Sequence, residues 1–178
     1  EITAAGAAIK LSGQVQAVEN SGYVVFLPRH DAHDGAARLR QQLKFSDVVF
    51  PRQIIHEAVL CDTLPAGDRI TPLVDIIKQN FDGRFAECWL ETADTNEAKE
   101  LSGFLKRFSP AFNSAASKTG IVNARRGSGR LHVFFLGSGA AWIGVTDHAN
   151  SAPWPMGIPR LKMPRDAPSR STLKLAEA

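Results

Sequence analysis

The sequence predicts an α+β fold made of two modules. Two strand–turn–strand patterns, over residues 14–27 and 131–145, each have turn-forming residues at their centre. Between them, residues 95–108 carry apolar side chains at the spacing of one helix face. The sequence then becomes rich in proline: residues 148–170 hold five of the ten prolines. We therefore expect two folded modules followed by a connecting segment.

The composition is that of a globular protein with a mild excess of positive charge. Hydrophobic residues make up 44% of the 178 residues and charged residues 22%, which suffices for a buried core. Lys and Arg number 21 against 18 Asp and Glu, a balance that permits a nucleic-acid partner without requiring one. Two cysteines without a CxxC pair argue against a disulfide framework or a structural zinc. No apolar run approaches the ~20 residues of a membrane span. We expect a cytoplasmic monomer that binds neither metal nor membrane.

The first module, residues 1–60, has the order of a ferredoxin-like unit. That unit runs strand, helix, strand, strand, helix, strand. Here the tail of a helix comes first, so we expect the initial strand and most of the first helix to precede Glu1. The remaining elements are expected as strands at 14–19 and 23–27 around a turn at Asn20–Gly22, a helix at 34–43, and a strand at 48–59 interrupted by Pro51.

The second module, residues 61–148, alternates helices and strands. A helix is predicted from Thr71-Pro72, with Pro at its first position, to about Asn80, and a strand at 84–93. Asp94 and Glu97 have capping-box spacing before a second helix. That helix carries its apolar face on Leu101, Phe104, Leu105 and Phe108. We expect a separate short helix at 111–119, ended by Gly120, and then a hairpin around Gly137-Ser138-Gly139.

The last stretch reads as a linker followed by the start of a new element. Residues 149–170 are rich in proline, which favours an extended, semi-rigid spacer. After Pro168, Ser169 or Ser171 can cap a helix, so residues 171–178 begin an element at the end of the sequence. Globular helices usually run longer than one or two turns, so a chain that ends here ends where an element begins.

Two possible sites are better explained as ordinary structure. Gly137-Ser138-Gly139 lacks the third glycine of a dinucleotide loop and precedes a strand, whereas that fingerprint precedes a helix, so a hairpin turn is favoured. The segment His30–Asp34 has metal-ligating residue types, but a metal site needs supporting groups that the sequence does not show. A solvated loop is the favoured interpretation.

Two basic segments are candidates for RNA backbone contacts. Arg side chains bind phosphate through a planar fork of donors, and charge neutralisation releases counterions. Flexible glycine-containing loops suit this role. For the loop that contains Arg125, Arg126 and Arg130, a solvated hairpin tip is an equally balanced alternative. The candidates are Arg125, Arg126 and Arg130 in a loop, and Arg160, Lys162 and Arg165 in the linker.

Several stretches together resemble one known family, the bacterial 23S ribosomal RNA 2′-O-ribose methyltransferase M family, which modifies a cytidine. The resemblance implies a ferredoxin-like domain over residues 1–60, a THUMP RNA-binding domain over 61–148, and the start of a Rossmann-like domain that binds S-adenosylmethionine. It also implies 23S ribosomal RNA as the partner. The stretches are FSDVVFPRQ (45–53), RITPLV (69–74), ADTNEAKEL (93–101), HVFF (132–135) and MGIPRLKMPRDAPSRSTLKLAEA (156–178).

The resemblance also assigns roles near the end of the sequence. Ser171 matches a family position that contacts S-adenosylmethionine, and Lys174 matches the first lysine of a Lys-Asp-Lys-Glu catalytic tetrad. The other three tetrad members and the glycine-rich cofactor loop have no counterpart in the 178 residues. We therefore expect this chain alone to be inactive, and the parent enzyme to use its front modules to hold RNA.

Two other functions stay open. A stand-alone RNA-binding or ribosome-associated adaptor without catalysis fits the same residues, and a reading frame that stops after Ala178 would favour it. A protein-interaction domain fits less well because of the basic linker. Trp89, Trp142 and Trp154 could stack on bases, although tryptophans in strands more often belong to the core.

Overall fold

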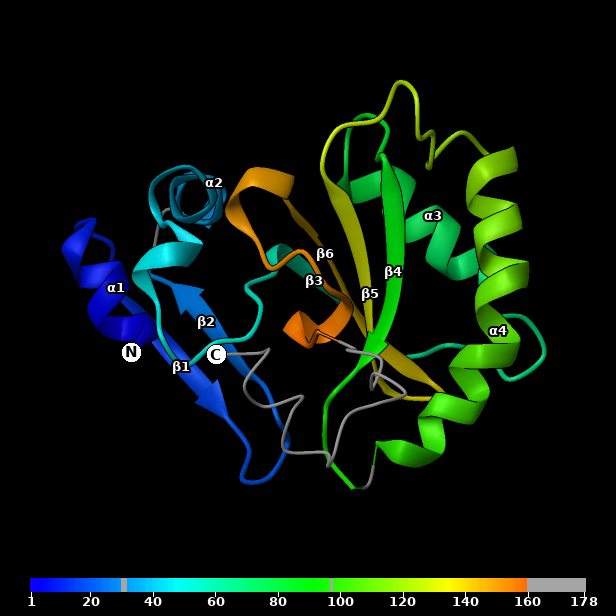
Figure 1. Ribbon diagram of the computed structural model, residues 1–178, viewed down its shortest axis with the longest axis horizontal. Coiled ribbons are helices and arrows are strands. Elements are labelled where there is room, and N and C mark those ends of the chain that lie inside the picture. Colours follow the sequence, from blue (N-terminus) through cyan, green and yellow to red (C-terminus); the bar gives the residue numbers. More distant parts are fainter. Residues whose placement is uncertain (30–31, 97, 160–178) are drawn as a thin grey trace, which may run out of the picture.

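The computed structural model describes residues 1–29, 32–96 and 98–159, and it shows a mixed α/β chain with two separate sheets (Figure 1). We call residues 1–55 the first unit and residues 56–146 the second unit. The elements are α1 (Ile2–Ala8), β1 (Gly13–Ala17), β2 (Val24–Pro28), α2 (Ala32–Gln42), β3 (His56–Cys61), α3 (Ile70–Asn80), β4 (Glu87–Thr92), α4 (Lys99–Lys118), β5 (Arg130–Gly137) and β6 (Ala140–Thr146).

The first unit is a hairpin packed with two helices. Strands β1 and β2 pair antiparallel, with Val15 opposite Phe26, as the sequence predicts. The turn between them places Asn20 and Gly22 at positive φ angles of 60° and 75°, a conformation that favours these two residue types. Helix α2 begins two residues before its predicted start. Among the described residues of the unit, the buried hydrophobic core is small and consists of Leu11, Leu39 and Leu43.

The second unit is a four-stranded sheet covered by helices α3 and α4 on one face (Figure 1). The strand order is β3-β6-β5-β4, with β4 parallel to β5 and the other pairs antiparallel. Because side chains alternate along a strand, Leu131, Val133 and Phe135 of β5 belong to the buried core, whereas Arg130 and His132 point to the opposite face. The predicted hairpin around Ser138 is confirmed.

Strand β3 differs from the sequence prediction in position and in partner. It spans 56–61 rather than 48–59, and it pairs with β6, so it belongs to the second sheet and not to the first. The preceding residues do not extend the strand, because Pro51 lacks an N–H group and the N–H groups of Val49 and Phe50 donate to the Glu1 carboxylate. Val49 and Phe50 are each more than 80% exposed.

Helix α4 is one continuous helix, which corrects the prediction of a second short helix at 111–119. Pro110 lies inside it and removes a hydrogen bond, at a cost of about 3 kcal/mol. The helix persists because aromatic side chains on both sides of Pro110 are packed: Phe108 stacks on Phe112, and Phe108 also meets Phe135 edge to face. Phe112 is fully buried.

The two helix starts also differ in detail from the prediction. At α3, Pro72 is the third helical residue, and the Asp68 carboxylate accepts hydrogen bonds from the N–H groups of Ile70 and Thr71. At α4, the N-cap residue is Ala98 and no side chain caps the helix; the Thr95 hydroxyl accepts from the Ala98 N–H just before it, in place of the contact expected of Asp94. Glu97 lies outside the described residues.

The segment after β6 is packed and not extended, in contrast to the expected spacer. Residues 147–159 form two short 3-10 turns, His148–Asn150 and Pro155–Gly157, and lie between the two units (Figure 1). Ala152 is buried, and hydrogen bonds connect the segment to both units. The remainder of the predicted linker lies outside the described residues.

Candidate nucleic-acid interface

The loop of residues 123–129, between α4 and β5, is held tightly by its own backbone and by the start of β4. The side-chain oxygen of Asn123 accepts hydrogen bonds from the N–H groups of Arg125 and Arg126, each at 3.1 Å. Gly127 lies so close to the Phe85 backbone that a Cβ atom would overlap it. The loop is therefore a fixed platform and not a flexible basic segment.

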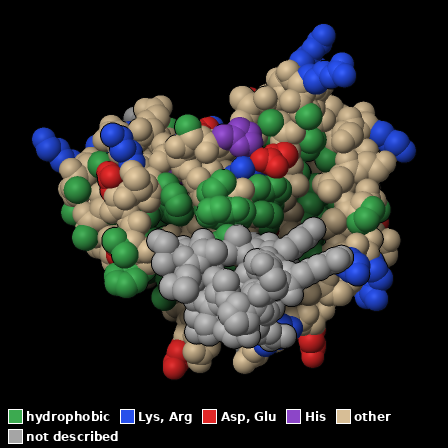
Figure 2. Space-filling model, in the orientation of Figure 1, with side chains coloured by type: hydrophobic (Ala, Val, Ile, Leu, Met, Phe, Trp, Pro, Cys, Tyr) green, Lys and Arg blue, Asp and Glu red, His purple; other side chains and the backbone are tan. Residues whose placement is uncertain are grey.

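Arg125 and Arg126 are both exposed on this platform, and their role as RNA contacts stays a prediction. Arg84 is also exposed, and its carbonyl oxygen accepts a hydrogen bond of 2.9 Å from the Ser128 N–H, which places its backbone beside the loop. Figure 2 shows Lys and Arg side chains projecting at the end of the molecule where Figure 1 places this loop. We call Arg84, Arg125 and Arg126 the basic platform. Sequence reasoning missed Arg84, because this hydrogen bond and the parallel bridge between Phe85 and Val122 bring it to the loop.

Arg130 is not part of the exposed surface, although the sequence grouped it with Arg125 and Arg126. It is 4% exposed at the start of β5. Its guanidinium carbon lies 3.4 Å from the ring centroid of Trp89, and its Nε donates to the Glu87 carboxylate at 2.9 Å. A stacked and paired guanidinium is satisfied within the protein, so Arg130 does not offer its charge to phosphate in this structure.

A buried polar row continues from Arg130 across the same face of the sheet. His132 Nδ1 lies 2.5 Å from a Glu91 carboxylate oxygen, and His132 Nε2 lies 2.9 Å from the Thr146 hydroxyl. Carboxylate, imidazole and hydroxyl in this order resemble a nucleophile relay. All three side chains are nevertheless buried, with His132 and Thr146 at 0% exposure, so a substrate cannot reach the hydroxyl. The row is a structural network that satisfies polar groups inside the fold.

The other buried titratable groups are also unsuited to catalysis. Burial, together with the nearby positive charge of Arg40, lowers the pKa of His56 to about 4, so His56 is neutral at physiological pH. Burial and the carboxylates of Glu91 and Glu87 raise the pKa of the Cys88 thiol far above its usual range. Cys88 is therefore protonated and not an activated nucleophile.

The tryptophans occupy three different environments. Trp89 lies under Arg130, and Trp142 is partly buried with an indole N–H that finds no hydrogen-bond acceptor among the described residues. Trp154 is 47% exposed. Of the three, Trp154 has the accessible ring that base stacking would require.

Several predicted residues cannot be placed. His30 and Asp31 lie outside the described residues, and residues 32–34 form the first turn of α2. Within residues 1–29, 32–96 and 98–159, no group of three or more His, Cys, Asp or Glu side chains could hold a metal ion. The same ranges contain no helix of the length and apolarity needed to cross a bilayer. Arg160, Lys162, Arg165, Ser171 and Lys174 also lie outside the described residues, and their roles stay predictions.

Comparison with known families divides the chain at nearly the same place as the two sheets do. Residues 1–55 match the model of the RlmM ferredoxin-like domain, and residues 68–147 match the model of the ribosomal RNA large subunit methyltransferase M, N-terminal. The chain belongs to the ribosomal RNA large subunit methyltransferase M family. The match of 1–55 confirms the predicted ferredoxin-like domain, and it stops where β3 joins the second sheet.

Individual members of the family match over the whole chain. A ribosomal RNA large subunit methyltransferase M from Methylococcus capsulatus is 49% identical over 180 residues, which cover 100% of this chain and 49% of that protein. Proteins of the same name from Dickeya chrysanthemi and Actinobacillus pleuropneumoniae are 42% and 41% identical, again over 100% of this chain and 48% and 49% of their own length. The chain therefore spans about half the length of the curated relatives it matches.

Proposed function

We propose that this chain is the RNA-holding front portion of an enzyme that transfers a methyl group from S-adenosylmethionine to a cytidine 2′-hydroxyl of 23S ribosomal RNA. The observation that carries the proposal is the identity of 49% over the whole chain to a protein named ribosomal RNA large subunit methyltransferase M. The substrate atom and the cofactor come from the family resemblance. The setting would be the cytoplasm, with the protein acting as a monomer.

The division of labour follows the two units. We propose that the first module is the ferredoxin-like domain and that residues 61–148 are a THUMP RNA-binding domain, with residues 149–170 joining it to a Rossmann-like methyltransferase domain that begins at 171–178. Because β3 pairs with β6, the second module would start near His56 and not at residue 61.

Phosphate contacts are assigned to exposed basic side chains. The basic platform offers three guanidinium groups, two of them on a loop whose backbone is held by Asn123, so binding a phosphate would order side chains without ordering the loop. The linker residues Arg160, Lys162 and Arg165 would extend this footprint. Arg130 leaves the list of RNA contacts, because its guanidinium is already paired and stacked inside the fold.

Two residues are assigned to the catalytic domain. Lys174 would orient or activate the ribose hydroxyl. To act as a base, a lysine must lose its proton, and burial or cationic neighbours promote that loss. Ser171 would donate a hydrogen bond to S-adenosylmethionine, which supplies the methyl group. A single hydrogen bond has a net value of about 1 kcal/mol, against the ~8 kcal/mol of micromolar binding. Residues 1–178 alone should therefore bind no S-adenosylmethionine at micromolar concentrations in calorimetric titration.

The test uses the full-length protein and 23S ribosomal RNA from cells that lack the gene. Mass spectrometry of RNA digests should show one 2′-O-methylcytidine after incubation with S-adenosylmethionine and the wild-type protein. Lys174→Ala should abolish the product while cofactor affinity stays within a few fold, and Lys78→Ala on the exposed side of α3 should act like wild type. Product formation by Lys174→Ala would contradict the assignment of Lys174.

A stand-alone adaptor is the alternative function, because the described residues would need only RNA-binding chemistry in either case. The same assay separates the two. If a full-length protein with both units forms no methylated nucleotide but binds the RNA, the adaptor replaces the enzyme as the explanation.

A further inference from the structure

Arg130 uses two of its three guanidinium nitrogens to hold the segment that follows the second unit. Its Nε donates to Glu87, on β4 of its own sheet. Its Nη1 donates to the Ser151 hydroxyl and to the Ala152 carbonyl, each at 3.2 Å, and its Nη2 lies 3.2 Å from His148 Nδ1. Two of the three nitrogens therefore serve residues 148–152. We call residues 147–157 the strap.

A second anchor fixes the far end of the strap to the same face of the sheet. The Met156 N–H donates to a carboxylate oxygen of Glu91, the residue that also contacts His132. Glu91 is 2% exposed, so this backbone hydrogen bond lies in a region shielded from water. Arg130 and Glu91 thus hold both ends of the strap against β4 and β5.

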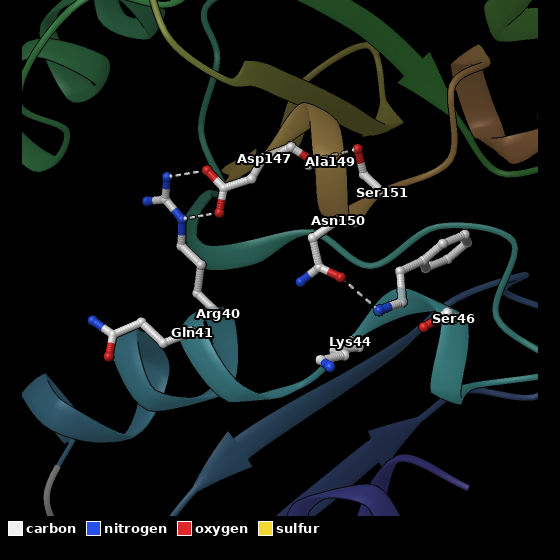
Figure 3. A pocket seen from close by; sticks show the side chains of 9 residues that line it. Arg40, Gln41, Lys44, Ser46, Asp147, Ala149, Asn150 and Ser151 are labelled. Atoms are coloured by element: carbon white, nitrogen blue, oxygen red, sulfur yellow. Dashed lines mark hydrogen bonds and ion pairs between the residues drawn. The ribbon is translucent and has the colours of Figure 1, made fainter.

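The outer side of the strap contacts the first unit. The Asn150 side chain accepts a hydrogen bond of 2.7 Å from the Phe45 N–H (Figure 3). It also donates one of 2.8 Å to the Leu43 carbonyl. The Asp147 carboxylate pairs with Arg40 of α2 at 2.7 Å (Figure 3). Asp147 and Asn150 therefore join the strap to helix α2 and to the turn that follows it.

Two more contacts continue this seam toward the end of the strap. The Gln53 side chain exchanges hydrogen bonds with the backbone N–H and carbonyl of Ala152. Gly157, with a φ of 63°, lies against the Arg52 backbone so closely that a side chain would overlap it. The strap thus touches the first unit along its length while Arg130 and Glu91 hold its inner side.

We propose that Arg130 is a positioning residue, which holds the strap between the units so that the first unit and the basic platform are carried as one body. The inference rests on the proposed function: if the units bind RNA, a fixed strap gives RNA bound to one unit a fixed position relative to the other unit. A lysine would keep the charge beside Glu87 but lacks the planar fork, so it could not reach Ser151, Ala152 and His148 together.

Spin-label distances in the 178-residue chain test the proposal. One label pair, Ala8→Cys on α1 and Asn113→Cys on α4, reports between units, and a control pair, Lys78→Cys and Asn113→Cys, reports within the second unit. Both pairs are made in a chain with Cys61 and Cys88 replaced by Ala. We expect a single narrow inter-unit distance that Arg130→Lys and Asn150→Ala each broaden, while the control pair stays narrow. Arg126→Lys, on the exposed platform, is the matched control and should leave both distances unchanged.

Three outcomes overturn the proposal. If the inter-unit distance stays narrow in Arg130→Lys and in Asn150→Ala, the strap does not set the arrangement. If Arg130→Lys also broadens the control pair, Arg130 serves only the fold of the second unit. If Arg130→Gln, which removes the charge, lowers the salt slope of binding to a 23S ribosomal RNA fragment, Arg130 touches phosphate directly; the expected result is a several-fold weaker affinity with an unchanged slope. The distance measurement uses no RNA, so a failure of RNA binding would count against the proposed function and not against the strap.

Discussion

The two units differ in how much of their stability each can supply alone. The second unit has a continuous core in which Leu73, Phe112 and Phe135 are fully buried between the sheet and helices α3 and α4. Among the described residues of the first unit, the buried core cluster is limited to three leucines, at positions 11, 39 and 43. A two-stranded hairpin with so small a core is marginal by itself. The arrangement of the first unit therefore depends on neighbours, and the strap is the neighbour with the most directed contacts.

The difference also separates two kinds of arginine. The basic platform belongs to the well-packed unit and projects outward, whereas Arg130, a few residues later, points inward and holds the strap. Arginines that are close in sequence thus have different surroundings, one set exposed and one buried against the strap. This difference follows from strand alternation, because Arg130 begins β5 on the face that the strap covers.

The largest effect should come from the core of the second unit. We expect Phe112→Ala to lower the free energy of unfolding by about 3 to 5 kcal/mol, because it leaves a cavity between α4 and the sheet. Urea titration followed by circular dichroism measures it. Phe50→Ala is the matched control, because Phe50 is 84% exposed and its loss should change stability by less than about 0.5 kcal/mol. Equal costs for the two variants would remove the contrast between core and surface.

The next effect concerns His56, at the start of β3 near the seam between the units. Burial and the charge of Arg40 lower the pKa of His56 from 6.5 to about 4. Between pH 6.5 and pH 4, His56 therefore binds a proton more readily in the unfolded chain than in the folded protein. Stability is therefore complete above pH 6.5 and is lost as the pH falls toward 4, by at most about 3 kcal/mol.

Urea midpoints at pH 8, 6 and 4 measure this loss, and His56→Gln should remove most of it. The pKa of Asp147 is lowered by its hydrogen bond with Arg40, so its contribution disappears only at more acidic pH, below 3.8. A pH dependence in His56→Gln equal to that of wild type would show that another group is responsible.

A smaller effect tests the start of helix α4. Thr95→Ala removes the acceptor of the Ala98 N–H and should cost about 1 kcal/mol. Asp94→Ala breaks an ion pair with Arg52 in which both side chains are 61% exposed, and it should cost less than about 0.5 kcal/mol. Thermal unfolding of the two variants ranks them. If Asp94→Ala costs more than Thr95→Ala, the sequence-based capping box is the better description.

Local chemistry explains what could be predicted from the sequence. Both hairpins were predicted because Asn20, Gly22 and Gly139 mark their turns, and the apolar face of α4 was visible in the spacing of its leucines and phenylalanines. The continuation of α4 past Pro110 was not predictable from local signals, because it depends on Phe108 packing against Phe135 of a distant strand.

Long-range contacts explain what was missed in the candidate interface. Proline-rich composition suggested an extended spacer, yet Asn150 and Ala152 are held by residues about a hundred positions earlier in the chain. Arg84 is brought to the basic platform by the parallel bridge between Phe85 and Val122 and by the hydrogen bond from Ser128, which no sequence pattern indicated. The alternation of Arg130 and His132 with Leu131 and Val133 indicates a strand with one apolar and one polar face, but the pattern does not show that the polar face is covered.

The most direct measurement of the central claim is a filter-binding salt series on the 178-residue chain with a fragment of 23S ribosomal RNA. Each lost phosphate contact lowers the log–log slope by about 0.7 to 0.9, so Arg125→Ala/Arg126→Ala should lower it by roughly 1.5 and weaken all RNAs about equally, because phosphates carry no direct sequence information. Arg160→Ala/Lys162→Ala should act in the same way. Lys78→Ala/Lys106→Ala, which removes the same charge from exposed sites on α3 and α4, should keep the wild-type slope. If both arginine-containing double variants also keep that slope, the basic platform and linker do not hold RNA, and the account is contradicted.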